Sequence, residues 1–325
     1  MAQRVWDAFD RYPFNSPWIR GLIGRYWLVT WFFANSGLAL VHSASNTSLL
    51  FFDARLYLDA IAAWLQGRDP WAVQLAGNFF AAPPPSLLPL APIAILPRDV
   101  GVAVVASSVI VAAVASVRLL RLPWWWIMFP PLVQSILSAN IHALVLPLVL
   151  VGWGALAVPL KLYAAIPLLV LGRWRSLWVA AIAIGVTVPF LPWGPYVTQF
   201  ELINARLMEQ TRHALPTPVL IAMAPIALLS MWIVGRERAA WLAIPALWPS
   251  QQYYYGSLAI GARNGLAAAL VALPINGSGL IALVVLALVI WHRDGPPALP
   301  AWRSRPPRGT IEAVAPSTGP LDSEP

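Results

Sequence analysis

The stretch VGVAVVASSVIVAAVASV, residues 100–117, decides the fold class of this 325-residue chain. It runs for 18 residues without a charge, which is the length and composition of a membrane-spanning helix. The whole chain shares this character, because 59% of its residues are hydrophobic and only 10% are charged. Soluble domains carry about 25% charged residues. The sequence therefore predicts an all-α, polytopic membrane protein.

Other apolar runs lie on both sides of this stretch, each separated from the next by a short loop. A span needs only about 20 apolar residues, so we expect about 9 to 12 crossings, several of them short or broken by proline. The expected runs are 26–42, 83–96, 100–117, 124–137, 140–171 as two short passes, 176–193, 217–234, 240–258, 262–274 and 278–291. We interpret residues 26–292 as one bundle, with a cytoplasmic segment at 1–25 and a disordered, proline-rich tail at 293–325.

The net charge of +8 comes from small arginine clusters between the apolar runs, and Lys161 is the only lysine. Such clusters are typical of loops that fix the orientation of a membrane protein. We therefore expect a multi-pass protein of the cell membrane with a cytoplasmic N-terminus, in contact with lipid and not with nucleic acid. The chain has no cysteine and only four scattered histidines, so neither a disulfide nor a metal site is expected.

Residues 53–66, in the first outer loop (43–82), carry the periodicity of an amphipathic helix. Asp53 and Tyr57 fall on its apolar side, whereas Arg55 and Asp59 fall on the other side at a spacing that favours an ion pair. The pattern predicts a helix lying along the membrane surface with its apolar face down. Asp53 is the anomaly on that face: it is the cap of the helix, a functional carboxylate, or both.

The prolines at 83–85, 89 and 92 are denser than ordinary helix kinks require. A bilayer cannot hydrate the carbonyls that proline leaves free, so broken helices occur where protein or a wet cavity satisfies them. Kinks in a bundle explain any single proline. The cluster indicates an irregular wall beside a cavity at the outer face.

Residues 51–73, FFDARLYLDAIAAWLQGRDPWAV, resemble the first-loop signature of glycosyltransferase family 87. That signature has an aspartate soon after the first span (here Asp53) and a tyrosine in an amphipathic helix (Tyr57). A Gly-x-Asp-Pro turn follows at 67–70, and aromatic residues precede a Pro-Pro pair at 83–84.

Two later segments are also similar to the family. Asn140, Lys161 with Tyr163, and the Arg173–Arg175 pair match its Gln-x-Asn, Lys-Leu-Tyr and Arg-x-Trp-Arg elements. Residues 246–258, ALWPSQQYYYGSL, resemble a late segment in which the family has a histidine where this chain has glutamine and tyrosine. The resemblance covers residues 50–180 most fully.

This resemblance implies the GT-C fold class, whose polytopic enzymes take mannose from a polyprenyl phosphate. It implies inverting transfer of a hexose to a lipid- or glycan-type acceptor at the extracytoplasmic face. Asp53 would be the catalytic residue, a general base that takes the proton of the attacking hydroxyl, while cations hold the leaving phosphate. The expected outer loops hold no Asp-x-Asp pair, so we expect neither a metal-bound nucleotide sugar nor any cofactor.

Two sets of residues complete the expected site. The predicted phosphate-binding cations are Lys161, Arg206, Arg212 and Arg263. The predicted substrate-lining residues are Tyr57, Asn140, His142, Gln251, Gln252 and Tyr253. Structural alternatives exist: Lys161 can extend to an interface, the arginines of 194–215 can belong to a solvated surface helix, the tyrosines can form an interfacial aromatic belt, and His142 can be a core residue.

Two other functions share these features. A transporter or flippase of lipid-linked sugars also has proline-broken spans and buried charges, although it more often shows internal repeats, which we do not detect. A catalytically degenerate relative that binds lipid or a partner protein would keep the fold and lose the chemistry. The missing late histidine favours that second alternative.

Overall fold

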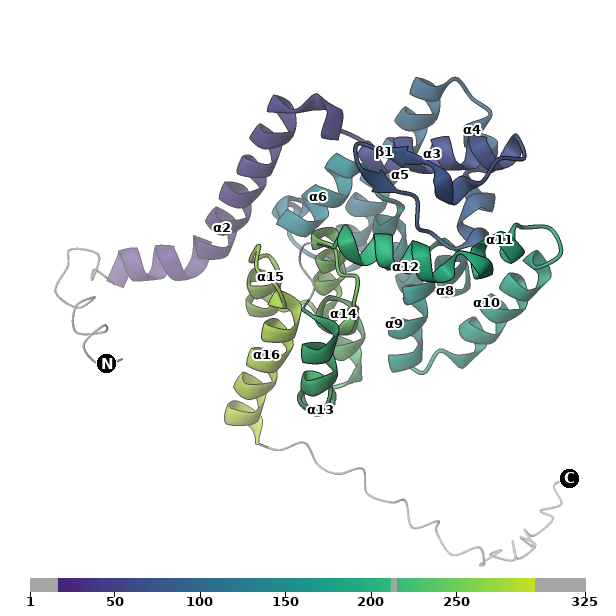
Figure 1. Cartoon of the computed structure of the whole chain (residues 1–325). Helices are drawn as coiled ribbons and strands as arrows, with labels where there is room; N and C mark the ends of the chain where they lie inside the picture. Colours follow the sequence, from purple (N-terminus) through teal and green to yellow (C-terminus); the bar gives the residue numbers. More distant parts are fainter. Residues whose placement is uncertain (1–16, 212–214, 296–325) are drawn as a thin grey trace, which may run out of the picture.

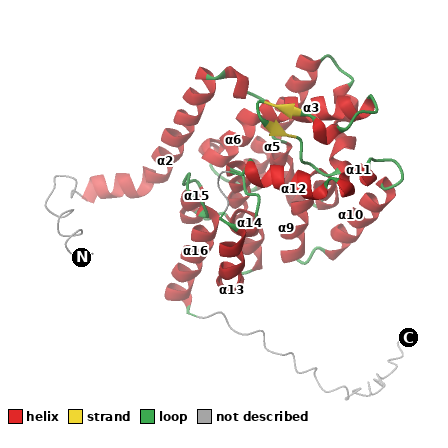
Figure 2. Cartoon of the chain, viewed as in Figure 1, coloured by secondary structure: helices red, strands yellow, loops and turns green. Residues whose placement is uncertain are grey.

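The computed structural model describes residues 17–211 and 215–295, with side chains from residue 26 onward. These residues form helices joined by short loops, together with one small antiparallel hairpin of β1 (Gln74–Leu75) and β2 (Asn78–Phe79) (Figures 1 and 2). The all-α prediction is confirmed for this part of the chain. Most of the expected cytoplasmic segment and nearly all of the expected tail lie outside the described residues.

The first half of the chain begins with the long helix α2, which leans away from the other helices in Figure 1. Its Phe32 is fully buried against Trp126 and Phe129, with ring centroids 5.4 and 5.1 Å apart, and this aromatic contact holds α2 to the body. The helices of this half are α2 (Pro17–Ser45), α3 (Phe52–Leu65), α4 (Ala91–Ala94), α5 (Arg98–Leu119), α6 (Pro130–Ser138), α7 (Val145–Leu150) and α8 (Gly154–Leu160).

In the second half, α13, α14 and α16 pack side by side, and α12 crosses above them in Figure 1. A Cβ atom at Gly279 of α16 would lie 2.0 Å from the carbonyl oxygen of Pro245 in α14, so only glycine permits this close approach. The helices of this half are α9 (Ala165–Val170), α10 (Trp174–Thr187), α11 (Trp193–Thr198), α12 (Phe200–Glu209), α13 (Thr217–Val234), α14 (Arg236–Leu247), α15 (Gly265–Val271) and α16 (Ser278–Asp294).

The region 140–171 is more finely divided than the two expected passes. It contains the short helices α7, α8 and α9, which break at Gly152 (φ 90°) and at Lys161 (φ −147°). Pro159 lies inside α8 and removes a backbone donor there, whereas Pro147 and Pro167 lie in the first turns of α7 and α9, where the N–H has no partner within the helix.

The helix expected at 53–66 is confirmed as α3, but its expected place on the surface is wrong. Seven residues of α3 are buried, among them Ala54 and Leu58. The reason is that small and apolar side chains also occupy the side of the helix that carries Arg55 and Asp59. The 3₁₀ segment Pro84–Leu90, α4 and α5 cover the helix. It therefore has a core position beneath the proline-rich segment.

The expected ion pair between Arg55 and Asp59 is also wrong. The Arg55 guanidinium turns back over the start of α3 and donates to the backbone oxygens of Ser48, at 3.2 Å, and Leu50. Asp59 instead forms a salt bridge with Arg98 at the start of α5, at 2.6 Å. The Arg55 guanidinium thus binds carbonyl oxygens of the turn before α3 instead of the Asp59 carboxylate.

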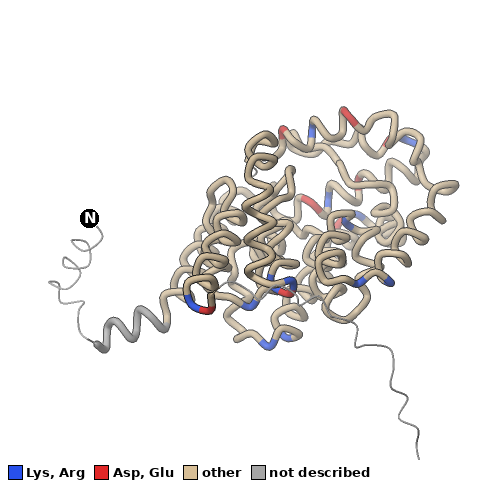
Figure 3. Tube along the Cα trace, turned by 90° about the horizontal axis from the view of Figure 1, so that it is seen from below, with Lys and Arg blue, Asp and Glu red and all other residues tan. Residues whose placement is uncertain are grey.

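Helix length and apolarity single out two helices in the described part of the chain that can cross a membrane, α5 and α13. Helix α10 and the stretch Ile141–Leu150 are apolar but shorter. Figure 3 shows how sparse charge is along the described trace, which is mostly tan with isolated blue and red positions.

Candidate functional site

A cavity of about 970 Å³ lies between α3, the β1–β2 hairpin, α12 and the segment 248–255. Six described residues of the expected site line it: Asp53, Tyr57, Asn140, Lys161, Gln252 and Tyr253. Leu38, Ala39 and His42 of α2 line another part of the wall. The volume is at the upper end of the ~300–1,000 Å³ range of pockets that bind small molecules.

Two chain reversals bring Asp53 and Asn140 together. Phe51, before α3, and Ala139, after α6, both adopt left-handed conformations, with φ values of 55° and 51°. The Phe51 amide donates to the Leu137 carbonyl oxygen at 2.7 Å, which ties the start of α3 to the end of α6. Left-handed non-glycine residues are uncommon and gather at functional sites.

The side chain of Asn140 orients the Asp53 carboxylate. Asn140 Nδ2 donates to Asp53 Oδ2 at 2.9 Å, while Asn140 Oδ1 accepts from the backbone N–H of His142 at 2.8 Å. Both ends of the amide are therefore fixed, and Asp53 does not cap its own helix, because the cap position is Phe51. The alternative interpretation of Asp53 as a helix cap is wrong.

Lys161 is placed by the break between α8 and the following 3₁₀ turn. Its ammonium group donates to the hydroxyl of Tyr57 at 2.5 Å and lies 5.0 Å from the centre of that ring. The side chain is 8% exposed and faces the cavity. Tyr57 stands one helical turn after Asp53, so a carboxylate and an ammonium share one wall of the cavity.

Burial raises the pKa of the half-buried Asp53 carboxyl above its ordinary value. Hydrogen bonds from Asn140 and Ser138 and the charge of Lys161 act in the opposite direction without cancelling that rise. Burial, and then the charge of Asp53, also raise the pKa of Tyr57, which stays a neutral phenol. A carboxylate with a raised pKa is a stronger base than one in water, as general-base catalysis requires.

The segment 248–255 forms another wall of the cavity and places two expected residues there. Gln252 and Tyr253 line the cavity; Gln252 Nε2 donates to the backbone oxygen of Gln210 at 3.0 Å and Tyr253 donates to that of Ala272 at 2.7 Å. Gln251 is 5% exposed and does not line this cavity.

His142 lies behind the cavity wall and is fully buried. Its Nδ1 is 2.6 Å from the hydroxyl of Tyr163, and its ring packs against those of Tyr254 and Tyr255. Its Nε2 has no hydrogen-bond partner among the described residues. The structure thus places His142 in a layer that supports the site.

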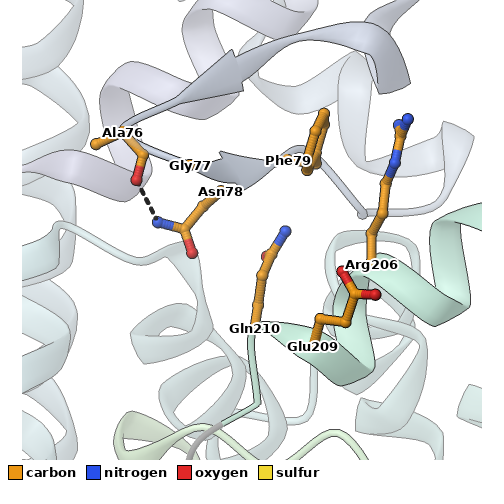
Figure 4. A pocket seen from close by; sticks show the side chains of 7 residues that line it. All are labelled: Ala76, Gly77, Asn78, Phe79, Arg206, Glu209 and Gln210. Carbon is orange, nitrogen blue, oxygen red and sulfur yellow. Dashed lines mark hydrogen bonds between the residues drawn. The ribbon is translucent and has the colours of Figure 1, made fainter.

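Neither Arg206 nor Arg263 joins Lys161 in the large cavity. Arg206, on α12, lines a smaller cavity, and its guanidinium carbon lies 4.0 Å from the centre of the Phe79 ring (Figure 4). Arg263 is exposed in a left-handed conformation (φ 51°) at the end of the 3₁₀ segment Tyr253–Ala262 and does not line the large cavity. Arg212 lies outside the described residues.

The expected Gly-x-Asp-Pro turn is structural. Asp69 accepts from the backbone N–H of Trp71 at 2.9 Å and from Gln199 at 3.0 Å, which joins the turn to the start of α12. Trp71 is fully buried and donates to the Ala82 carbonyl oxygen at 3.0 Å. The motif therefore fixes the turn 67–70 against α12 and against Ala82, which lines the large cavity.

Reasoning from the sequence missed several residues that line the cavity. They are Tyr163, Tyr196, Asn204 and Gln210. Tyr254 and Tyr255 also line the cavity, and they belong to the tyrosine run 253–255, which was expected to form an aromatic belt or to contact the sugar. Tyr163 lies in the Lys-Leu-Tyr element already matched to the family, so that element carried a signal for it. Asn204 lies on α12 and Gln210 directly follows this helix, whose position over the cavity has no signature in the sequence.

Compared with protein-family models, with curated proteins and with solved structures, the chain gives no match.

Proposed function

We propose that this protein is a GT-C-like membrane glycosyltransferase. It transfers a hexose, mannose by resemblance, from a polyprenyl phosphate to an acceptor hydroxyl, with inversion at the anomeric carbon. The observation that carries the proposal is the convergence of Asp53, Asn140 and Lys161 from three elements on one large cavity. These residues supply a base, a group that orients it and a cation.

The exposed surface supports a membrane location. On α10, Trp178, Ile182 and Val186 recur at helical spacing and are 70, 63 and 62% exposed. A stripe of large apolar side chains is expensive in water and favourable against lipid. Leu38 and Val41 of α2 are exposed in the same way, next to the part of the cavity wall that α2 forms.

The arginines support an orientation with the cavity at the outer face. A Cβ atom at Gly172 would lie 3.8 Å from Arg236 Nη1, and the charge of Arg238 reaches Asp294. The α9–α10 loop, the α13–α14 loop and the end of α16 therefore lie at one end of the bundle, away from α3 (Figure 1). By the positive-inside rule that end is cytoplasmic.

The chemistry follows from the residues of the cavity. The oxygen of the acceptor hydroxyl attacks the anomeric carbon as the Asp53 carboxylate takes its proton. The bond from that carbon to the phosphate oxygen breaks, and its electron pair stays on the phosphate. The ammonium group of Lys161 stabilises the charge that develops there. Asn140 donates to Asp53 Oδ2 and so fixes the orientation of the carboxylate that takes the proton.

The test is turnover by the purified protein in lipid, with labelled polyprenyl-phosphate mannose and a panel of glycan and lipid acceptors. We expect the label to move to an acceptor and free polyprenyl phosphate to appear in equal amount. Movement of intact labelled donor across a sealed vesicle, without cleavage, would identify a transporter instead. Donor binding without either process would identify a degenerate relative.

A further inference from the structure

The smaller cavity, of about 270 Å³, lies between α12 and the β1–β2 hairpin (Figure 4). Its lining residues are Ala76, Gly77, Asn78, Phe79, Arg206, Glu209 and Gln210. Asn78, Phe79 and Gln210 also line the large cavity. The two cavities therefore adjoin each other at these three residues.

The polar groups of the small cavity are mostly uncommitted. Gln210 Nε2 is buried and has no hydrogen-bond partner among the described residues. The Glu209 carboxylate has no ion pair or hydrogen bond within the same part of the chain. Asn78 Nδ2 donates to the Ala76 carbonyl oxygen at 3.3 Å (Figure 4), and Asn78 Oδ1 accepts no hydrogen bond from the described residues. A buried donor without a partner is costly unless a ligand satisfies it.

The charges and the aromatic ring define the class of ligand. Arg206 and Glu209 place one positive and one negative charge in the same small space, which disfavours both an anion and a cation. The Arg206 guanidinium also packs over the Phe79 ring and donates a hydrogen bond to the Trp71 carbonyl oxygen at 3.4 Å. What remains is a set of free donors and acceptors beside an aromatic ring. A neutral, hydroxyl-rich ring uses both kinds of group.

We propose that the small cavity is an acceptor subsite that binds the sugar unit next to the one whose hydroxyl reacts. This inference rests on the proposed function and narrows it, because it makes the acceptor a glycan of at least two units. A volume of about 270 Å³ falls just below the ~300–1,000 Å³ of pockets for drug-sized ligands, so it suits one ring. Gln210 and Phe79 are the residues that distinguish a two-unit acceptor from a one-unit acceptor.

The test compares methyl α-mannoside with a methyl α-mannobioside as acceptors for the protein in lipid. We expect kcat/KM to be about tenfold or more higher for the disaccharide. The variants Gln210→Leu and Phe79→Leu should lower kcat/KM for the disaccharide more than for the monosaccharide and so remove most of that preference. Gln66→Leu, at an exposed glutamine that lines neither cavity, is the matched control and should keep the preference.

A binding measurement separates this inference from the proposed function. In saturation-transfer NMR without donor, both rings of the disaccharide should receive magnetisation from the wild type, and one ring should lose it in Gln210→Leu. If transfer is absent and this pattern is seen, the proposed function fails and the subsite stands. If transfer occurs with equal kcat/KM for the two acceptors, the subsite is refuted. It is also refuted if only one ring of the disaccharide receives magnetisation from the wild type.

Discussion

Asp53 is half-buried, accepts a hydrogen bond from Asn140 and feels the charge of Lys161. Neither neighbour is close in sequence, and the reversals at Phe51 and Ala139 are what bring the first of them into contact. The position of the carboxylate therefore depends on left-handed backbone conformations, which cost free energy in residues other than glycine. At the residue scale, the site is built by strain in the turns and by one fixed amide.

Removing the amide of Asn140 should change the pH dependence of transfer. Burial raises the pKa of Asp53, and the Asn140 hydrogen bond limits that rise. In Asn140→Ala the pKa rises further, so the carboxylate becomes protonated at higher pH and the rate falls earlier on acidification. The hydrogen bond stabilises the charged form of the carboxyl, so its loss should move the acid limb of the pH–rate profile to higher pH.

This profile distinguishes positioning from simple structural support. A variant that only loosens the fold lowers the rate at every pH and leaves the acid limb where it was. Asn204→Ala, at another asparagine that lines the cavity without touching Asp53, provides the matched control. An unchanged acid limb in Asn140→Ala would remove Asn140 from its assigned role.

Lys161 should control affinity for the donor. In Lys161→Met the phosphate loses its cation, and we expect the KM for the polyprenyl-phosphate sugar to rise about tenfold or more. Lys161→Arg keeps the charge and should recover part of the loss. Equal KM values for wild type and Lys161→Met, measured over a full range of donor concentration, would rule out the phosphate contact.

At the scale of elements, small residues decide how closely helices approach. Gly279→Ala forces a Cβ atom against the backbone of Pro245, so α16 must move away from α14. We expect a loss of stability of about 1–3 kcal/mol, the usual cost of overpacking, seen as a lower midpoint of thermal unfolding in lipid or detergent.

The control for that change is Gly185→Ala in α10. No atom lies within 4 Å of a Cβ at this position, and its φ is not positive. Alanine in a helix is favoured over glycine by about 0.5–1 kcal/mol, so Gly185→Ala should leave stability unchanged or raise it. Equal effects of the two substitutions would contradict the packing of α14 against α16.

The elements that follow from local patterns were predictable from the sequence. Helix α13 has the bounds expected for its apolar run, and α3 lies within one residue of its expected limits. The breaks in 140–171 were harder, because they depend on how prolines and Gly152 fit the packed bundle. The burial of α3 depends on the segment 84–90 and on α4, which begin 19 and 26 residues after the end of α3, and the local periodicity of the sequence does not predict such a contact.

The candidate site was likewise predictable in part from the sequence. Asp53, Tyr57, Asn140 and Lys161 were identified from sequence segments and meet in one cavity. Gln251 and Arg263 were expected in the site on similar grounds and do not line the cavity; Gln251 is buried outside its lining, and Arg263 is exposed at the end of the 3₁₀ segment Tyr253–Ala262. Residue type and spacing indicate which groups can take part, whereas long-range packing determines which of them meet.

At the scale of the whole molecule, the proposal requires that exposed apolar surface faces lipid. Ile182 is 63% exposed on α10, and an arginine within a membrane costs about 2.5–3.5 kcal/mol on insertion scales. Ile182→Arg should therefore reduce the fraction of protein that remains in membranes after alkaline washing. Gln66→Arg, at an exposed position outside the expected spans, should leave it unchanged.

If α10 faced water, Ile182→Arg would leave the fraction of membrane-bound protein unchanged or would improve the solubility of the protein. That result would contradict the lipid-facing surface. It would leave the arrangement of Asp53, Asn140 and Lys161 as it stands, because these residues lie inside the bundle.

The central claim is that Asp53 is the base in sugar transfer, and two matched substitutions on one helix test it most directly. Asp53→Asn keeps the shape of the side chain and removes the base. Asp59→Asn removes a carboxylate on the same helix that pairs with Arg98 outside the cavity. With equal amounts of folded protein, we expect Asp53→Asn to lower kcat by about 10²–10⁴-fold and Asp59→Asn to leave it near that of wild type. Transfer by Asp53→Asn at the wild-type rate would contradict the account.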